Sequence, residues 1–318
     1  LLPSAAYGHT FLAAIVPTCP NDRGRDGGVK TNMMRPVARP ACLWAIWLIL
    51  FTGAAGAGER GLLFEIGAEA VPPCYLFGTL HSEDARVLTL SLATQDAFDR
   101  SPVFVMEVIP DAQAIIRAMM TMVYTDGRSL AQVVGQPLYG RVVRVLSEMG
   151  IPEEASKDYK PWAAATQIGM PKADTGEFLD IRLYKAALAA DKQVIGLETI
   201  EEQLAVFDSL DEEDQIGLLQ ETLDARDQLP AVFERLLEAY LGRDLAALAL
   251  LGDEYLRQGD PQLADRFRRA ALDVRNLRMA DRTHAYLRAG GCFIAVGALL
   301  RPGDEGILAR LAQRGFEV

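Results

Sequence analysis

The stretch Cys74-Tyr-Leu-Phe-Gly-Thr-Leu-His81 is the starting point for predicting the fold of this chain. Its first residues suit a buried β-strand, and a glycine and a histidine follow where that strand would end. The chain contains three histidines, His9, His81 and His284. His81, at the exit of an apolar strand, is therefore the leading candidate for a chemical group. The alternative is a structural histidine that caps the strand or hydrogen-bonds a loop carbonyl.

Strand and helix patterns continue on both sides of this stretch. Residues 61–66 have a strand pattern and Pro72-Pro73 marks a turn, so 61–66 and 74–78 are predicted to form a hairpin. Apolar residues at helical spacing follow over 90–98, and a near-continuous apolar strand spans 102–108. This order of strand, helix and strand predicts a βαβ unit with parallel strands buried on both faces.

The rest of the chain adds two strands and many helices. Apolar strands are predicted at 192–198 and 292–297, whereas 111–190 and 200–290 are mostly helical in pattern. We therefore expect a single α/β (α+β) domain over residues 58–318. It should contain a central, mostly parallel sheet with βαβ units and a large helical insertion.

The N-terminal region is typical of a targeting segment rather than of folded structure. A basic start is followed by the apolar run 41–51 and by small residues up to Gly58, which predicts a signal peptide over 33–57. The apolar run has 11 residues, fewer than the ~20 that span a bilayer. An uncleaved membrane anchor is the alternative. Residues 1–32 resemble an over-extended translation start. We expect an exported protein, periplasmic or extracellular, with no stable membrane span after cleavage.

Composition limits the classes of function. The formal net charge is −11. This argues against a nucleic-acid-binding protein, because neutralising phosphates requires clustered lysine and arginine. Half of the residues are hydrophobic, so a large core is available.

Two of the predicted strands end in a carboxylate. Glu107 interrupts the strand 102–108, and Glu198 ends the strand 192–198. A carboxylate in an apolar strand is unfavourable unless it is paired or binds a ligand. Open α/β sheets also bind ligands at the carboxyl ends of parallel strands. The alternatives are that Glu107 reaches solvent and that Glu198 is an ordinary acid near a helix N-terminus.

An internal similarity links two of the strands. Residues 75–81 and 294–300 share an apolar strand, a glycine, a small residue and a leucine, but differ at the last position. Cys74 and Cys292 precede the two glycines by four or five residues. If these strands are neighbours, a disulfide can form, which requires Cα atoms within about 7 Å. Two buried free thiols are the alternative.

Several short motifs together resemble the TraB/PrgY/GumN family, which is related to the TIKI proteases. The similarity covers roughly residues 60–318 and follows the order of the family. The matching segments are YLFGTLH (75–81), VFVMEV (103–108), VIGLET (194–199) with Gln203 shortly after, RNLRMA (275–280) and FIAVGALLRPGDEGILARLAQRGFEV (293–318).

This resemblance implies an α/β fold in which two glycine-x-x-histidine motifs end central strands. The two histidines, with acidic residues, would form a divalent-metal site, and family members would act as metal-dependent peptidases. His81 matches the first motif histidine, Glu107 and Glu198 match the strand-end acids, and Arg275 matches a recurrent arginine. The expected metal ligands are His81, Glu107 and Glu198, and the expected catalytic residues are Glu107, Glu198 and Arg275. Mn, Co or Zn suits such mixed ligands.

One position departs from the family pattern. Leu300 stands where the second motif histidine is expected, and leucine cannot bind a metal. Two functions follow from the sequence. The first is an exported metal-dependent hydrolase that acts on peptide bonds in a peptide or protein substrate. The alternative is a degenerate, non-catalytic member that binds a peptide or another ligand. For Arg275, on a predicted long helix, a solvated side chain is the alternative to a functional one.

Overall fold

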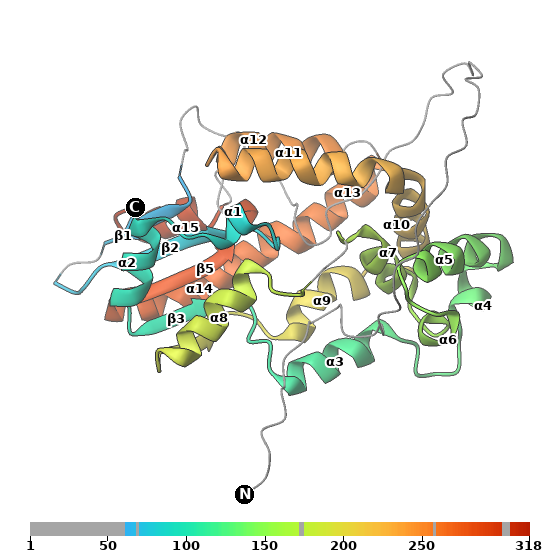
Figure 1. Cartoon of the computed structure of the whole chain (residues 1–318), viewed down its shortest axis with the longest axis horizontal. Helices are drawn as coiled ribbons and strands as arrows, with labels where there is room; N and C mark the ends of the chain where they lie inside the picture. Colours follow the sequence, from blue (N-terminus) through green and yellow to red (C-terminus); the bar gives the residue numbers. More distant parts are fainter. Residues whose placement is uncertain (1–60, 68–69, 172–174, 257–258, 301–305) are drawn as a thin grey trace, which may run out of the picture.

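The computed structural model describes residues 61–318 except 68–69, 172–174, 257–258 and 301–305. Within this part of the chain, the strands form one mixed sheet with the order β1-β2-β5-β3-β4 (Figure 1). Strands β1 and β2 pair antiparallel, and β2, β5, β3 and β4 run parallel to one another. The strands are β1 (Leu63–Ile66), β2 (Cys74–Thr79), β3 (Val103–Met106), β4 (Gln193–Gly196) and β5 (Cys292–Gly297).

The predicted hairpin and βαβ crossover are both confirmed, with one addition. Strands β2 and β3 are parallel and connected through α2 (Leu92–Arg100), but β5 lies between them. The last strand of the chain therefore occupies the centre of the sheet. Its register sets Ile294 beside both Leu76 and Val105, and all three side chains are buried.

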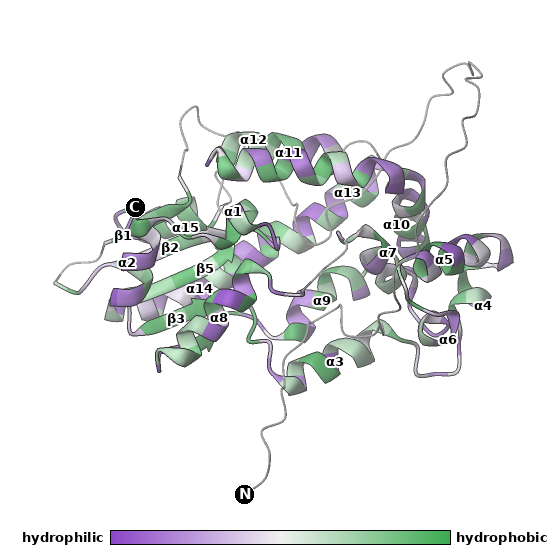
Figure 2. Ribbon diagram, in the orientation of Figure 1, coloured by the Kyte–Doolittle hydropathy of each residue, from purple (hydrophilic) through white to green (hydrophobic). Residues whose placement is uncertain are grey.

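Helices cover the sheet on both faces, as near-continuous apolar strands require. On one face, Phe77, Phe104 and Phe293 share a core with α2 and α8 (Leu179–Ala189). On the other face, Leu76 and Ile294 share a core with α14 (Val274–Ala289) and α15 (Ile307–Gln313). Figure 2 shows apolar residues concentrated on the strands, whereas the helices carry both apolar and polar residues.

The predicted helical insertion is also confirmed. Figure 1 shows the sheet at one end of the molecule and much of the helical part at the other. Ring contacts hold three helices of this part together: Trp162 stacks on Phe207 with centroids 5.5 Å apart, and Phe207 packs at a tilt against Phe267 with centroids 5.3 Å apart. The remaining helices are α1 (Ala85–Leu88), α3 (Ala112–Met122), α4 (Leu130–Val134), α5 (Gln136–Glu148), α6 (Glu153–Ser156), α7 (Pro161–Gly169), α9 (Ile200–Asp208), α10 (Glu212–Ala225), α11 (Leu229–Leu241), α12 (Leu245–Leu256) and α13 (Pro261–Arg268), and a π-helical segment, Arg269–Asp273, joins α13 to α14.

A disulfide joins the first residues of the two strands that resemble each other in sequence. Strands β2 and β5 are neighbours, and the Cα atoms of Cys74 and Cys292 lie 4.6 Å apart. The structure thus has the disulfide rather than two free thiols. Directly before β5, Gly290 has a φ of +76°, and the amide of Gly291 donates to the Pro72 carbonyl at 3.1 Å.

The targeting predictions fall mostly outside this part of the chain. The predicted signal peptide, 33–57, and the segment 1–32 lie outside the described residues, so export stays a prediction. Among the described helices, none has the length and apolar character needed to cross a bilayer.

Candidate functional site

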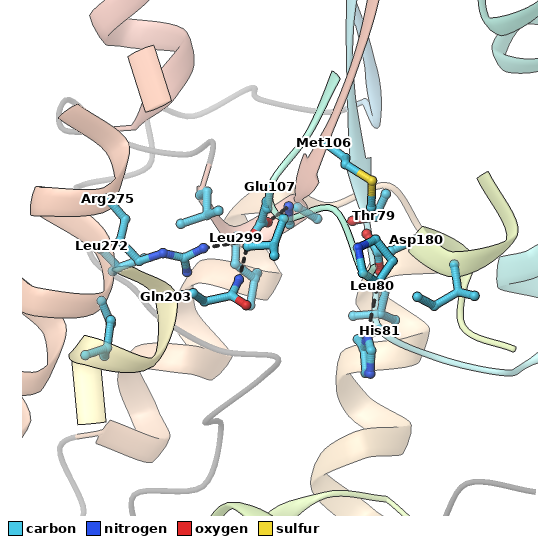
Figure 3. A pocket seen from close by; sticks show the side chains of 18 of the residues that line it. Thr79, Leu80, His81, Met106, Glu107, Asp180, Gln203, Leu272, Arg275 and Leu299 are labelled. Atoms are coloured by element: carbon cyan, nitrogen blue, oxygen red, sulfur yellow. Dashed lines mark hydrogen bonds and ion pairs between the residues drawn. The ribbon is translucent and has the colours of Figure 1, made fainter. Parts of the chain in front are cut away.

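A pocket lies at the carboxyl ends of the parallel strands, where the sheet meets the helical insertion. The segments that follow β2, β3 and β5 line it, and α8, α9 and the region around the start of α14 complete its walls (Figure 3). Apolar side chains supply most of the lining. Three of the four predicted site residues, His81, Glu107 and Arg275, line this pocket. Glu198 lies directly behind Arg275, with which it forms an ion pair.

Glu107 follows β3 and is tied to its surroundings by both carboxylate oxygens. The Gly297 amide donates to Oε1 at 2.7 Å. Arg275 Nη2 and Gln203 Nε2 donate to Oε2 at 2.6 and 3.2 Å. Glu107 therefore connects the end of β3 to the end of β5 and to two helices, and it is not simply a strand-end acid that reaches solvent.

Glu198 is more deeply buried than Glu107. Its side chain has an exposed fraction of 0%. Arg275 Nε and Nη2 donate to Oε2 at 2.8 and 2.7 Å, and Arg278 Nη1 donates to Oε1 at 2.8 Å. Such charge-assisted hydrogen bonds are among the strong ones in proteins. Glu198 is thus a buried, doubly paired carboxylate rather than an ordinary acid at a helix N-terminus.

Arg275 is the centre of this group, which we call the strand-end cluster: Glu107, Glu198, Arg275 and Arg278. The Arg275 side chain is only 10% exposed, so the solvated interpretation is wrong. Burial alone would lower the pKa of Arg275, but attraction by Glu107 and Glu198 outweighs it and raises that pKa above its ordinary value. The cluster contains two carboxylates and two guanidinium groups, so its formal charges balance.

A second ion pair supports the cluster from outside. Arg282 Nη1 and Nη2 donate to the Glu202 carboxylate at 2.6 and 2.8 Å, and Nη1 also donates to the Leu197 carbonyl at 2.7 Å. The hydrogen bonds from Arg282 to the carboxylate lower the pKa of Glu202 to about 2. Glu202 and Thr199 form the capping box that begins α9.

His81 lies on the opposite side of the pocket from Arg275 (Figure 3). Its ring stacks on Phe178, with centroids 3.7 Å apart and an interplanar angle of 18°. Its Nδ1 lies 3.7 Å from Asp180 Oδ2. Asp180 thus belongs to the pocket, although no sequence motif singles it out. An aspartate in the first turn of a helix is ordinarily a solvated residue favoured by the helix dipole.

The donor set does not fit a divalent metal. Within the described residues, no three His, Cys, Asp or Glu side chains are grouped so that they could hold an ion. Arginines occupy the carboxylates of Glu107 and Glu198, and Leu300, buried in the pocket wall, supplies no ligand. The roles of His81, Glu107 and Glu198 as ligands of Mn, Co or Zn therefore stay predictions.

Comparison with curated proteins finds distant relatives among the TIKI proteins. The zebrafish (Danio rerio) metalloprotease TIKI1 is 25% identical, over 78% of this chain and 60% of the relative. The human (Homo sapiens) metalloprotease TIKI1 is 24% identical, over 78% of this chain and 59% of the relative. The chain thus spans about 60% of the length of these relatives. No solved structure matches it.

The family comparison covers the whole described fold. The family model matches residues 62–318, which include every strand of the sheet and the whole pocket. The motifs that end β2, β3 and β4 and that begin α14 all lie within this range, so the chain belongs to the TraB/PrgY/gumN family.

Proposed function

We propose that this protein binds a peptide or an extended protein segment in the pocket and does not complete the metal site expected for its family. One observation carries the proposal: Arg275 holds both strand-end carboxylates, Glu107 and Glu198, in direct ion pairs. A carboxylate held by a guanidinium is already charge-compensated and has fewer lone pairs to offer a metal.

Electrostatics makes a metal unfavourable beside this cluster. A divalent ion bound by Glu107 and Glu198 would lie within a few ångströms of the Arg275 guanidinium. The two positive charges would repel each other strongly, because the site is poorly solvated. Releasing Arg275 instead would leave a buried cation without its partners, which is unfavourable by several kcal/mol. Leu300 removes the imidazole that would offset such a loss.

The lining of the pocket supports a peptide as the ligand. Apolar side chains from six segments surround a few polar groups, which is the usual composition of a ligand site. The distant relatives are named metalloproteases, and proteases bind peptide segments. A pocket inherited from such proteins can bind the same class of ligand without cleaving it.

The second candidate is an exported metal-dependent hydrolase that acts on peptide bonds. The names of the relatives favour it, as does His81, which keeps its place beside the pocket. Its predicted ligands are His81, Glu107 and Glu198, with Mn, Co or Zn as the ion. It requires a different arrangement of Arg275 from the one described above.

Three measurements on the purified protein separate the candidates. Metal content is determined by mass spectrometry, hydrolysis of a peptide library is followed with and without added Mn²⁺, and retention of the same library is quantified on immobilised protein. We expect substoichiometric metal, no Mn-dependent hydrolysis and retention of peptides. Val108→Trp, which fills the pocket, should abolish retention, and Leu188→Trp on an exposed helix face should not.

The opposite result is equally definite. Stoichiometric metal, together with Mn-dependent hydrolysis that is lost in His81→Ala, would establish the hydrolase and overturn the binding proposal. Leu300→His provides a further comparison. Because Arg275 still compensates both carboxylates in that variant, we expect the single substitution to leave the metal content substoichiometric.

A further inference from the structure

The charged side chains that line the pocket are not equally compensated. Glu107 and Arg275 belong to the strand-end cluster, whose charges balance within itself. Asp180 lies apart from that cluster, on the side of the pocket that holds His81 (Figure 3). The described residues place no lysine or arginine in the pocket lining except Arg275, so Asp180 has no full cation beside it there.

The Asp180 carboxylate also keeps hydrogen-bonding capacity. Its contact with His81 Nδ1 measures 3.7 Å, which is longer than a hydrogen bond. A carboxylate can accept about four hydrogen bonds. The Asp180 side chain is 28% exposed, so a ligand can reach it. Stacking of His81 on Phe178 fixes the imidazole and keeps the two groups facing each other.

We infer that Asp180 is the cation subsite of this pocket and binds a primary ammonium group carried by the ligand. The inference rests on the proposed peptide-binding function and specifies the class of peptide. Ile181 and Leu80 line the pocket beside Asp180, so the ammonium group should be attached to an apolar portion of the ligand. Two parts of a peptide have this chemistry: its free N-terminus beside an apolar side chain, and the end of a lysine side chain with its apolar stem.

The test uses one randomised octapeptide library in four forms: with a free or an acetylated N-terminus, and with or without lysine. Retention of each form is quantified on the immobilised full chain. We expect the acetylated, lysine-free form to bind about tenfold to a hundredfold more weakly than the forms with a primary amine, as for loss of a charge-assisted hydrogen bond. If acetylated peptides with lysine still bind, the side chain is the source of the ammonium group; if they do not, the N-terminus is.

Variants of Asp180 provide an independent arm. Asp180→Asn is nearly isosteric and should weaken binding of the amine-bearing forms by the same factor of about tenfold to a hundredfold. Asp180→Glu keeps the negative charge and should retain part of the binding that Asp180→Asn loses. Glu177→Gln is the matched control. Glu177 is also an acid, lies just before the same helix, and pairs with Lys185 outside the pocket lining. It should leave retention unchanged. Circular dichroism and thermal unfolding verify that each variant is folded.

The outcomes distinguish this inference from the function on which it rests. Equal retention of the acetylated, lysine-free form and the amine-bearing forms would refute the cation subsite and leave peptide binding intact. Equal binding by Asp180→Asn and the unaltered protein would do the same. Absence of retention for every form would overturn both the cation subsite and the peptide-binding function.

Discussion

Replacing Arg275 by methionine tests whether the strand-end cluster holds the sheet and helix α14 together. Methionine keeps much of the length of the side chain but removes the guanidinium, and with it three hydrogen bonds of 2.6 to 2.8 Å to Glu107 and Glu198. Glu198, with an exposed fraction of 0%, would lose contact with one of its two cations. The free energy of unfolding should fall, because water cannot readily solvate the carboxylate that is left behind.

The size of the loss follows from what remains after the substitution. Breaking a buried ion pair by removing one partner costs about 3–5 kcal/mol. Arg278 still donates to Glu198 Oε1, and the Gly297 amide still donates to Glu107 Oε1. Because both carboxylates keep a partner, we expect a loss at the lower end of that range, about 3 kcal/mol.

Urea unfolding at neutral pH, followed by circular dichroism, measures this loss. Arg235→Met is the matched control, since Arg235 pairs with Glu254 at 3.0 Å with both side chains about half exposed. Exposed pairs of this kind contribute at most about 1 kcal/mol. The double variant Arg275→Met/Glu198→Gln should recover at least about 1 kcal/mol of the loss, because it removes the buried charge that the single variant leaves.

Two results would refute the reasoning. A loss for Arg275→Met no larger than that for Arg235→Met would mean that the cluster is not a buried, paired unit. Strict additivity of the Arg275 and Glu198 substitutions would mean that the two side chains do not interact, against the contacts of 2.7 and 2.8 Å.

Three further predictions concern the rest of the fold. The pKa of Glu202 is lowered from 4.5 to about 2 in the folded protein. The ionised Glu202 carboxylate therefore stabilises the fold above the pKa that it has in the unfolded chain, and this stabilisation is lost as the pH falls through about 2. Between about pH 5 and pH 2, the free energy of unfolding should fall more in the unaltered protein than in Glu202→Gln. Gly290→Ala should lower the thermal stability more than Gly127→Ala. Both glycines have a positive φ, but only at Gly290 would an added Cβ come within 2.5 Å of the Pro72 carbonyl oxygen. Equal effects of the two substitutions would contradict this reasoning. Removing the disulfide in Cys74→Ala/Cys292→Ala should cost about 2–5 kcal/mol in urea unfolding, and mass spectrometry of the alkylated protein should show Cys74 and Cys292 unmodified before reduction.

Local sequence patterns predicted the elements of the fold well, because most of them depend on apolar spacing and turn residues. The strands that begin at Cys74 and at Cys292 were predicted to within a residue or two of their observed bounds. The position of β5 between β2 and β3 was harder to predict from the sequence. Strand order depends on pairing between distant segments, and only the similarity between 75–81 and 294–300 indicated that β5 lies beside β2.

The candidate site was predicted in part for the same reason. His81, Glu107 and Glu198 follow strands, and the edge of a parallel sheet brings such residues together. The ion pairs with Arg275 and Arg278 were not predicted as contacts, because which side of a long helix faces the strand ends depends on tertiary packing. Asp180 was missed because it belongs to no motif and enters the pocket only through the docking of α8 on β3 and β4.

The charge balance of the strand-end cluster links Leu300 to Arg275. Two carboxylates at neighbouring strand ends require positive charge nearby, which either a metal or arginines can supply. In this protein, Arg275 and Arg278 bring the formal charge of the cluster to zero. Adding a divalent ion would leave an excess of two positive charges in a largely buried site unless a guanidinium moved away. Leu300→His would add a ligand without removing that excess. The missing imidazole at position 300 is therefore the departure from the family motif, whereas Arg275, which matches a recurrent arginine of the family, adds a positive charge that any bound ion would have to lie beside.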